Sequence, residues 1–190
     1  MLGSRFDEAL ALATRLHATQ LRKGTSIPYV AHLLSVAALV LEAGGDEDQA
    51  IAALLHDAVE DQGGAATLAE IRRRFGDRVA AIVDGCSDTD QVPKPPWRRR
   101  KEVYLEHLAE AGPDVLLVSL ADKIHNARAV LADLRVLGDG LWPRFSGGKD
   151  GELWYYRRLA DTFAARRPGA LADELGRTVA EIERLAGRAD

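Results

Sequence analysis

Apolar residues recur three and four positions apart along nearly the whole chain, and no segment alternates apolar and polar residues over a sustained stretch. A spacing near 3.6 residues places the apolar side chains on one face of an α-helix, whereas a half-buried strand shows a spacing of about two. The pattern therefore predicts an all-α fold that needs no strands. Helices are expected over residues 4–22, 29–43, 46–61, 67–75, 77–87, 97–111, 114–137, 151–166 and 170–186.

Gly and short polar residues mark the ends of several of these helices. Gly44 and Gly45 precede Asp46, so that one helix is expected to end where the next can be capped. Thr67 and Glu70 have the spacing of a capping box, in which each side chain satisfies a backbone N–H of the first turn. These signals support helical folding and carry no information on function.

Two segments are expected to be irregular. Residues 88–96 contain three prolines and residues 138–151 contain five glycines, so both predict mobile loops near a functional site. No internal repeat, low-complexity tract or linker divides the chain. Residues 1–190 are therefore expected to pack as a single-domain helical bundle, with the helices over 151–186 at its C-terminal end.

The composition is that of a soluble globular protein, with 47% hydrophobic and 28% charged residues. The 25 Lys and Arg residues against 29 Asp and Glu give a net charge of −4, which argues against general binding to nucleic acid or to a membrane surface. The longest apolar stretch, residues 33–41, has about half the ~20 residues that a membrane-spanning helix requires. Any phosphate-binding site is therefore expected to consist of a small group of basic residues and not of a generally basic surface.

Cysteine use indicates a reducing compartment. Cys86 is the single cysteine, which excludes an internal disulfide and a zinc site built from several thiolates. The first ten residues carry acidic side chains where a signal peptide would have a long apolar run. A cytoplasmic location is the expectation.

The segment with the strongest chemical signal is AIAALLHDAVED, residues 50–61. Its first half is apolar, and its second half places His56, Asp57, Glu60 and Asp61 within one and a half helical turns. Three carboxylates beside a buried apolar stretch destabilise a helix unless a positive charge lies among them. A divalent cation would supply that charge. The alternative is an acidic helix end that faces solvent.

Further metal ligands would have to come from other helices, because a divalent ion held by imidazole and carboxylate needs at least four donors. His32 lies among apolar residues, and Asp122 follows an uninterrupted apolar run. Each also has a simpler interpretation. His32 could be a hydrogen-bonded core residue, and Asp122 could form a salt bridge with Lys123 or Arg128.

Taken together, one His, a His-Asp pair followed by Glu-Asp, and a later Asp resemble the signature of the HD-domain metal-dependent phosphohydrolases, a helical superfamily. The surrounding sequences resemble its alarmone-hydrolase branch, which comprises the hydrolase half of RelA/SpoT-type proteins and the stand-alone small alarmone hydrolases. The similarity covers about residues 6–137 and rests on the segments RKGTSIPYVAH, ALLHDAVED, FGDRVAAIVDGCSD and SLADKIHNAR.

This resemblance implies an HD-domain fold and a role for each matching residue. It implies Mn²⁺ or another divalent metal as cofactor, and removal of the 3′-pyrophosphate from guanosine 3′,5′-bis(diphosphate) or the pentaphosphate as the reaction. The implied metal ligands are His32, His56, Asp57 and Asp122, the implied catalytic pair is Glu60 and Asp61, and the implied substrate-binding residues are Arg22, Lys23 and Asn126.

The chain departs from the family pattern at two places. One extra residue stands between Lys23 and Pro28, so that either Thr25 or Ser26 could supply the usual hydroxyl. Ala129 stands where many relatives carry a threonine near the nucleotide, which leaves the preferred nucleobase open. At 190 residues the chain has no room for synthetase and regulatory domains, so hydrolysis alone is expected.

Two other functions are compatible with these residues. One is an HD phosphatase or phosphodiesterase acting on a different nucleotide, such as a deoxynucleotide or NADPH. The other is a non-catalytic module that binds a metal or nucleotide for regulation, which Glu60 and Asp61 argue against because a pure binding site needs no base. The expected partner is a small-molecule nucleotide, because one tryptophan beside four cations at residues 97–101 is weak support for nucleic-acid binding. The sequence indicates no oligomeric state.

The aromatic residues Trp154, Tyr155 and Tyr156 follow the glycine-rich segment. Aromatic runs on helices are mostly core residues, although one of these rings could stack on a base. The sequence does not decide between the two roles, nor does it decide whether the 138–151 segment closes over a substrate.

Overall fold

The computed structural model describes residues 2–87, 93 and 95–187, so most of the predicted loop over 88–96 lies outside the described residues. Within those ranges the chain is helical, and its one extended feature is an isolated β-bridge between Leu21 and Pro28. The all-α prediction is therefore confirmed. The helices are α1 Ser4–Leu16, α2 Val30–Glu42, α3 Glu47–Leu55, α4 Ala58–Asp61, α5 Gly64–Phe75, α6 Asp77–Cys86, α7 Trp97–Glu110, α8 Pro113–Leu137, the 3₁₀ helix η1 Gly138–Arg144, α9 Gly148–Arg166 and α10 Ala170–Ala186.

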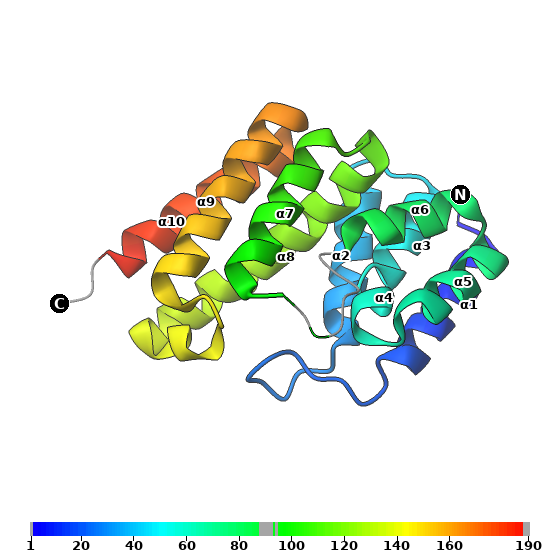
Figure 1. Cartoon of the computed structure of the whole chain (residues 1–190), viewed down its shortest axis with the longest axis horizontal. Coiled ribbons are helices and arrows are strands. Elements are labelled where there is room, and N and C mark those ends of the chain that lie inside the picture. Colours follow the sequence, from blue (N-terminus) through cyan, green and yellow to red (C-terminus); the bar gives the residue numbers. More distant parts are fainter. Residues whose placement is uncertain (1, 88–92, 94, 188–190) are drawn as a thin grey trace.

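Helix α8 runs through the middle of the molecule (Figure 1). On one side it packs against α9 and α10, and on the other side against α2, α3 and α6. Pro113 occupies its first turn, where a missing backbone N–H costs nothing, and every residue from Leu116 to Asp122 is buried. A helix stretch that is buried on all sides lies at the centre of a fold. Any polar group on this stretch therefore faces the interior.

The start of α3 follows the sequence prediction. Asp46 caps the helix, and its side chain and that of Gln49 satisfy each other's backbone N–H groups at 3.0 and 2.8 Å. All residues from Ala50 to Leu55 are buried, which anchors α3 in the core just ahead of the His-Asp pair. The predicted capping box at Thr67 is wrong. Helix α5 begins earlier, at Gly64, and the Thr67 hydroxyl donates to the carbonyl of Gln62 at 2.7 Å.

The helix predicted over 4–22 ends at Leu16, and residues 17–29 form a loop instead. Backbone hydrogen bonds from Arg22 to Ile27 (2.8 Å) and from Tyr29 to Gln20 (2.9 Å) close this loop on itself. Helical periodicity cannot reveal such pairing, because the partners lie at the two ends of the loop. The predicted helix over 46–61 is likewise interrupted, with turn residues at His56 and Asp57.

The segment 138–151 is more ordered than predicted. Residues Gly138–Arg144 form η1, and α9 already begins at Gly148. Leu141 and Trp142 are buried, and the Trp142 indole donates to Asp139 at 2.8 Å. Burial of these two apolar side chains stabilises the segment against α8 and α9, with which η1 packs.

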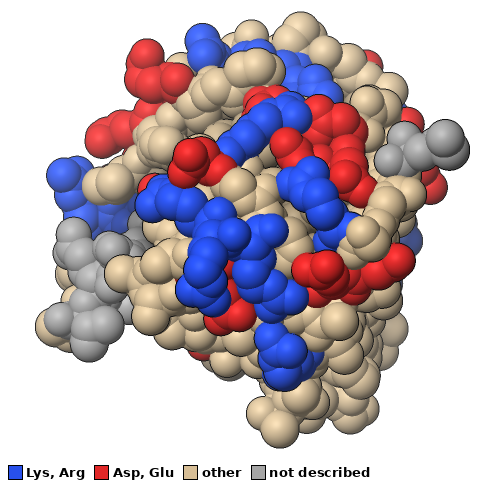
Figure 2. Space-filling view, turned by 90° about the vertical axis from the view of Figure 1, so that its right-hand side faces the viewer, with Lys and Arg blue, Asp and Glu red and all other residues tan. Residues whose placement is uncertain are grey.

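No described helix is both long enough and apolar enough to cross a bilayer. Figure 2 shows one end of the molecule, where Asp and Glu side chains lie among the Lys and Arg side chains. Opposite charges also pair closely, since Arg78 contacts Asp46 at 2.7 Å and Asp114 at 2.9 Å. The face shown in Figure 2 is not uniformly basic.

Candidate metal centre

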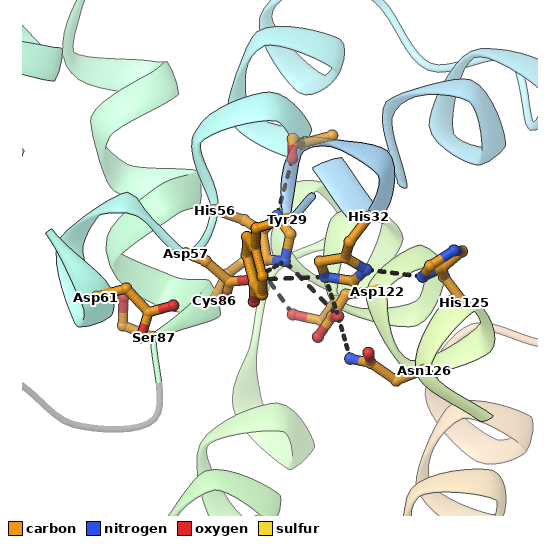
Figure 3. Close-up of polar contacts among 12 residues, drawn as sticks. Tyr29, His32, His56, Asp57, Asp61, Cys86, Ser87, Asp122, His125 and Asn126 are labelled. Carbon is orange, nitrogen blue, oxygen red and sulfur yellow. Dashed lines mark hydrogen bonds and ion pairs between the residues drawn. The ribbon is translucent and has the colours of Figure 1, made fainter. Parts of the chain in front are cut away.

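The four residues predicted to bind a metal come together from three parts of the fold (Figure 3). His32 lies on α2, the pair His56 and Asp57 lies between α3 and α4, and Asp122 lies on α8. The Nε2 atom of His56 is 3.0 Å from Asp57 Oδ2 and 3.6 Å from Asp122 Oδ1. The Nε2 atom of His32 is 3.5 Å from Asp57 Oδ2 and 3.2 Å from Asp122 Oδ1. Two imidazoles and two carboxylates therefore surround one point.

The other ring nitrogen of each histidine is already engaged. His56 Nδ1 lies 2.8 Å from the carbonyl oxygen of Ala53 and donates to it. His32 Nδ1 lies 2.7 Å from Nδ1 of His125. Burial, reinforced by His32 and Arg22, lowers the pKa of His125 to about 4, so its neutral ring can accept a hydrogen from His32. Both Nε2 lone pairs can then face the centre.

These buried donors fit a divalent cation. Within the described residues, His32 Nε2 and His56 Nε2 have no hydrogen-bond partner although both are buried. Buried polar atoms are normally satisfied, and an imidazole nitrogen facing carboxylates is a common ligand arrangement for Mn²⁺, Fe²⁺ or Zn²⁺. His32, His56 and Asp57 each offer one ligand atom within 4.8 Å of the others. The group is able to hold a metal ion.

The charges of the centre are strongly coupled. Burial alone would lower the pKa of His56, but the carboxylates of Asp57 and Asp122 outweigh burial and hold that pKa well above its usual value. Burial opposes ionisation of Asp122, yet Lys123 and the imidazoles keep its pKa well below the usual range. A cation that binds here supplies the positive charge that the His56 proton otherwise provides, and this proton is released.

Hydrogen bonds hold both carboxylates in place. The Tyr29 hydroxyl donates to Asp57 Oδ2 at 2.6 Å. Asp122 accepts from Lys123 Nζ at 2.6 Å and from Asn126 Nδ2 at 2.5 Å. The salt bridge between Asp122 and Lys123, which the sequence suggested as an alternative to metal binding, thus forms together with the imidazole contacts. The other suggested partner of Asp122, Arg128, binds Glu174 instead, at 2.7 Å.

Sequence reasoning missed Tyr29 and assigned no role to His125. Tyr29 precedes His32 by three positions, and residues three apart share a helix face, so this spacing was an available signal. His125 follows Asp122 by the same spacing. Both residues contact predicted ligands directly.

The predicted catalytic residues lie immediately after the His-Asp pair. The backbone N–H of Asp61 donates to the Asp57 carbonyl at 3.0 Å, which keeps the helical spacing between 57 and 61 despite the interruption. Asp61 is exposed and accepts from Gln20 Nε2 at 2.8 Å. Glu60 is half-buried on α4. Their catalytic role stays a prediction.

A cavity of about 460 Å³ adjoins the centre. The three predicted substrate-binding residues, Arg22, Lys23 and Asn126, all line it. Arg22 donates to Asn126 Oδ1 at 2.8 Å, and Asn126 in turn contacts Asp122, so hydrogen bonds connect the cavity to the centre. The wall also includes the cations Lys101 and Lys123, the aromatic residues Tyr29, Trp97, Phe145, Tyr155 and Tyr156, and the buried Glu152.

The residues of the aromatic run 154–156 differ in their surroundings. Tyr155 and Tyr156 are buried and line the cavity. Trp154 instead stacks under the guanidinium of Arg98, which lies 3.2 Å from the ring centre and also pairs with Glu102. Tyr155 and Tyr156 are therefore placed where a base could contact them.

Comparison with known proteins agrees with this geometry. The chain matches the HD domain family over residues 9–136. It is 40% identical over 124 residues to the guanosine-3′,5′-bis(diphosphate) 3′-pyrophosphohydrolase MESH1 of Xenopus tropicalis, covering 64% of this chain and 66% of that one. It is 38% identical over 125 residues to a probable GTP pyrophosphokinase of Mycobacterium leprae (strain TN), covering 65% of this chain and 16% of that one. The chain thus spans less than two thirds of the curated relatives it matches.

The solved structure of a metazoan ortholog of SpoT that hydrolyses ppGpp superposes with a TM-score of 0.75 and 29% identity, covering 100% of this chain and 99% of that one. The chain belongs to the HD-domain family. Within that family it is related to the hydrolase domain of the SpoT/RelA proteins and to the MESH1-type small alarmone hydrolases. The resemblance seen in the sequence is confirmed.

Glu152 makes the stability of the protein depend on pH. Its side chain is buried on α9, and burial raises its pKa from 4.5 to about 7, although Lys101 and Lys23 act in the opposite direction. Between these two values the folded protein retains a proton that the unfolded chain has lost. The free energy of unfolding therefore falls as the pH rises through this window, and it stays lower above pH 7.

Replacement Glu152→Gln removes this titration. The stability of the variant relative to the wild type is expected to increase by about 2 kcal/mol between pH 5.5 and pH 8. Urea denaturation of both proteins at the two pH values measures the change. Asp161→Asn, at an exposed position of the same helix, is the matched control and should give the same difference at both pH values. A pH-independent effect of Glu152→Gln would contradict the raised pKa.

Proposed function

We propose that the protein is a metal-dependent pyrophosphohydrolase that removes the 3′-pyrophosphate from guanosine 3′,5′-bis(diphosphate). The observation that carries this proposal is the convergence of two imidazoles and two carboxylates beside a cavity lined by cations and aromatic rings. Two further findings support it, namely membership of the HD-domain family and similarity to MESH1 and to the SpoT ortholog.

His32, His56, Asp57 and Asp122 would hold the metal, for which we propose Mn²⁺ because the ligands are nitrogen and oxygen without sulfur. Such a cation neutralises phosphate charge and lowers the pKa of a bound water. The protein's own residues supply the remaining chemistry. Glu60 and Asp61 are assigned to orient the attacking water and to accept its proton on a carboxylate oxygen.

In the proposed reaction the water oxygen bonds to the phosphorus that is attached to the ribose 3′ oxygen. The bond between that phosphorus and the 3′ oxygen breaks, the 3′ oxygen takes up a proton, and the products are GDP and pyrophosphate. Arg22 and Lys23 bind the departing pyrophosphate, because a guanidinium can donate two parallel hydrogen bonds to phosphate oxygens. Asn126 aligns Arg22 through the contact at 2.8 Å.

The test is turnover by the purified full chain loaded with Mn²⁺. Incubation with guanosine 3′,5′-bis(diphosphate) should yield equal amounts of GDP and pyrophosphate, as resolved by anion-exchange chromatography. Deoxynucleoside triphosphates, a cyclic dinucleotide and NADPH complete the panel. Turnover of one of these alone would assign a different HD phosphatase. Failure on every phosphate ester with the metal bound would indicate a binding module.

Arg22→Gln is expected to weaken substrate binding while leaving metal binding intact. A hydrogen bond to a charged group contributes about 1.5–3 kcal/mol, so KM should rise roughly ten- to a hundredfold. Steady-state kinetics measure KM, and calorimetric titration with Mn²⁺ measures metal affinity. Arg22→Lys keeps the charge but cannot form the bidentate hydrogen bonds, so its KM should lie between those of the wild type and of Arg22→Gln. An unchanged KM in both variants would remove Arg22 from the substrate site.

A further inference from the structure

The cavity beside the metal centre contains a buried carboxylate that the proposed reaction does not use. Glu152 on α9 lines the cavity, and its side chain is 7% exposed. Within the described part of the chain, no hydrogen bond or ion pair engages its carboxylate, although Lys23 and Lys101 act on it electrostatically. Asp133, another acidic residue of the cavity wall, is held by Arg144 at 3.0 Å. An ionised carboxylate on the wall of a cavity can accept hydrogen bonds from a ligand that enters it, so Glu152 suits a ligand that donates hydrogens.

The surroundings of Glu152 suit a flat aromatic ligand. Tyr155 and Tyr156 follow Glu152 on α9, and Trp97 lines the same cavity. Trp97 packs so closely on the start of α9 that a Cβ atom at Gly147 would lie 2.7 Å from its ring, and one at Gly151 would lie 3.1 Å away. The ring therefore packs against Gly151, the residue before Glu152, and lines the same cavity. Aromatic faces of this kind bind nucleobases of any type, so selectivity must come from a polar group.

Glu152 has the hydrogen-bonding character that distinguishes guanine. An ionised carboxylate only accepts hydrogen bonds. Guanine presents an N1–H and an N2 amino group side by side on its Watson–Crick edge, which is the edge that proteins read on unpaired bases. Adenine presents the N1 lone pair at the corresponding position, which would face the carboxylate oxygens. Ala129, also in the cavity wall, has a side chain that can form no hydrogen bond.

We infer that Glu152 is the specificity-determining residue of the cavity and selects guanine by accepting hydrogen bonds from N1–H and the N2 amino group. This inference rests on the proposed function, because it places the base of the nucleotide in the cavity beside the centre. It answers the question of base preference that the alanine at position 129 leaves open.

The test compares GDP, IDP and ADP binding to the full chain with Mn²⁺, measured by calorimetry. Hypoxanthine lacks the N2 amino group, so IDP removes one of the two hydrogen bonds. The wild type should bind GDP roughly tenfold more tightly than IDP and a hundredfold more tightly than ADP, in line with the free energy of hydrogen bonds to charged groups. Glu152→Gln should lose most of this preference through weaker GDP binding. Asp161→Asn should behave as the wild type.

Three results would overturn the inference. The first is an unchanged ratio of GDP to ADP affinity in Glu152→Gln. The second is an equal loss for all three diphosphates, which would mean that Glu152 acts by positioning Lys23 and Lys101. The third is a wild type without base preference. Glu152→Asp, which keeps the charge on a shorter side chain, should retain part of the preference and serves as a second variant. Base-selective binding without any hydrolysis would refute the proposed function and leave this inference standing.

Discussion

Asp57→Asn is expected to abolish Mn²⁺-dependent hydrolysis because it removes a charged donor from the point where the four predicted ligands converge. Asp57 Oδ2 lies 3.0 Å from His56 Nε2 and 3.5 Å from His32 Nε2, so an amide there replaces one of only two carboxylates. Substitution of a residue that only supports a metal ligand typically lowers metal affinity about 10- to 100-fold. Loss of a ligand should therefore weaken Mn²⁺ binding by more than about a hundredfold. Activity at limiting metal should fall in parallel.

Two measurements separate metal binding from folding. Calorimetric titration gives the Mn²⁺ affinity directly, and thermal denaturation with and without Mn²⁺ shows whether the cation still stabilises the folded state. The wild type should melt at a higher temperature with Mn²⁺, whereas Asp57→Asn should show little shift. Asp7→Asn, at an exposed position of α1, is the control for loss of a carboxylate. Retention of wild-type metal affinity in Asp57→Asn would exclude Asp57 as a ligand.

Glu60→Gln is expected to separate metal binding from catalysis. Glu60 follows the His-Asp pair by one helical turn on α4 and is not among the donors that converge on the centre. General-base catalysis contributes about 10²–10⁴-fold, so kcat should fall by that factor while Mn²⁺ affinity stays at the wild-type level.

Single-turnover kinetics with saturating Mn²⁺ measure the rate of the chemical step in Glu60→Gln, and calorimetric titration measures its Mn²⁺ affinity. Asp61→Asn is the informative comparison, because Asp61 is exposed and already accepts from Gln20. A larger rate loss at Glu60 than at Asp61 would identify the base within the pair. A joint loss of metal and rate would instead make Glu60 a ligand, and unchanged values would remove it from the mechanism.

Much of this architecture could be predicted from the sequence because helices bury one face at a regular spacing. The apolar run before Asp122 correctly indicated a buried polar group on a core helix, and the apolar half of 50–61 correctly indicated a buried helix just ahead of His56. The convergence of these residues with His32 followed from the family resemblance, since periodicity within single helices does not specify how they pack.

The remaining features depend on contacts between distant residues. The loop 17–29 is closed by backbone hydrogen bonds between its two ends, which no local pattern reveals. The break at His56 and Asp57 is too short to alter the hydrophobic spacing of its helix. Glu152 appears in the sequence as an ordinary polar position, and its significance arises only because α9 buries it in a cavity shared with Arg22 and Lys23.

The side-chain amide of Asn126 occupies a special position between the two halves of the site. Its nitrogen donates to Asp122, and its oxygen accepts from Arg22. A nucleotide that draws the guanidinium toward its phosphates therefore disturbs a group bonded to the carboxylate at the ionic centre. Thermodynamic linkage makes this influence reciprocal, so whatever factor the cation contributes to nucleotide affinity, the nucleotide contributes to retention of the cation. The contacts of Asn126 with Arg22 and Asp122 thus connect binding of the nucleotide to binding of the metal ion.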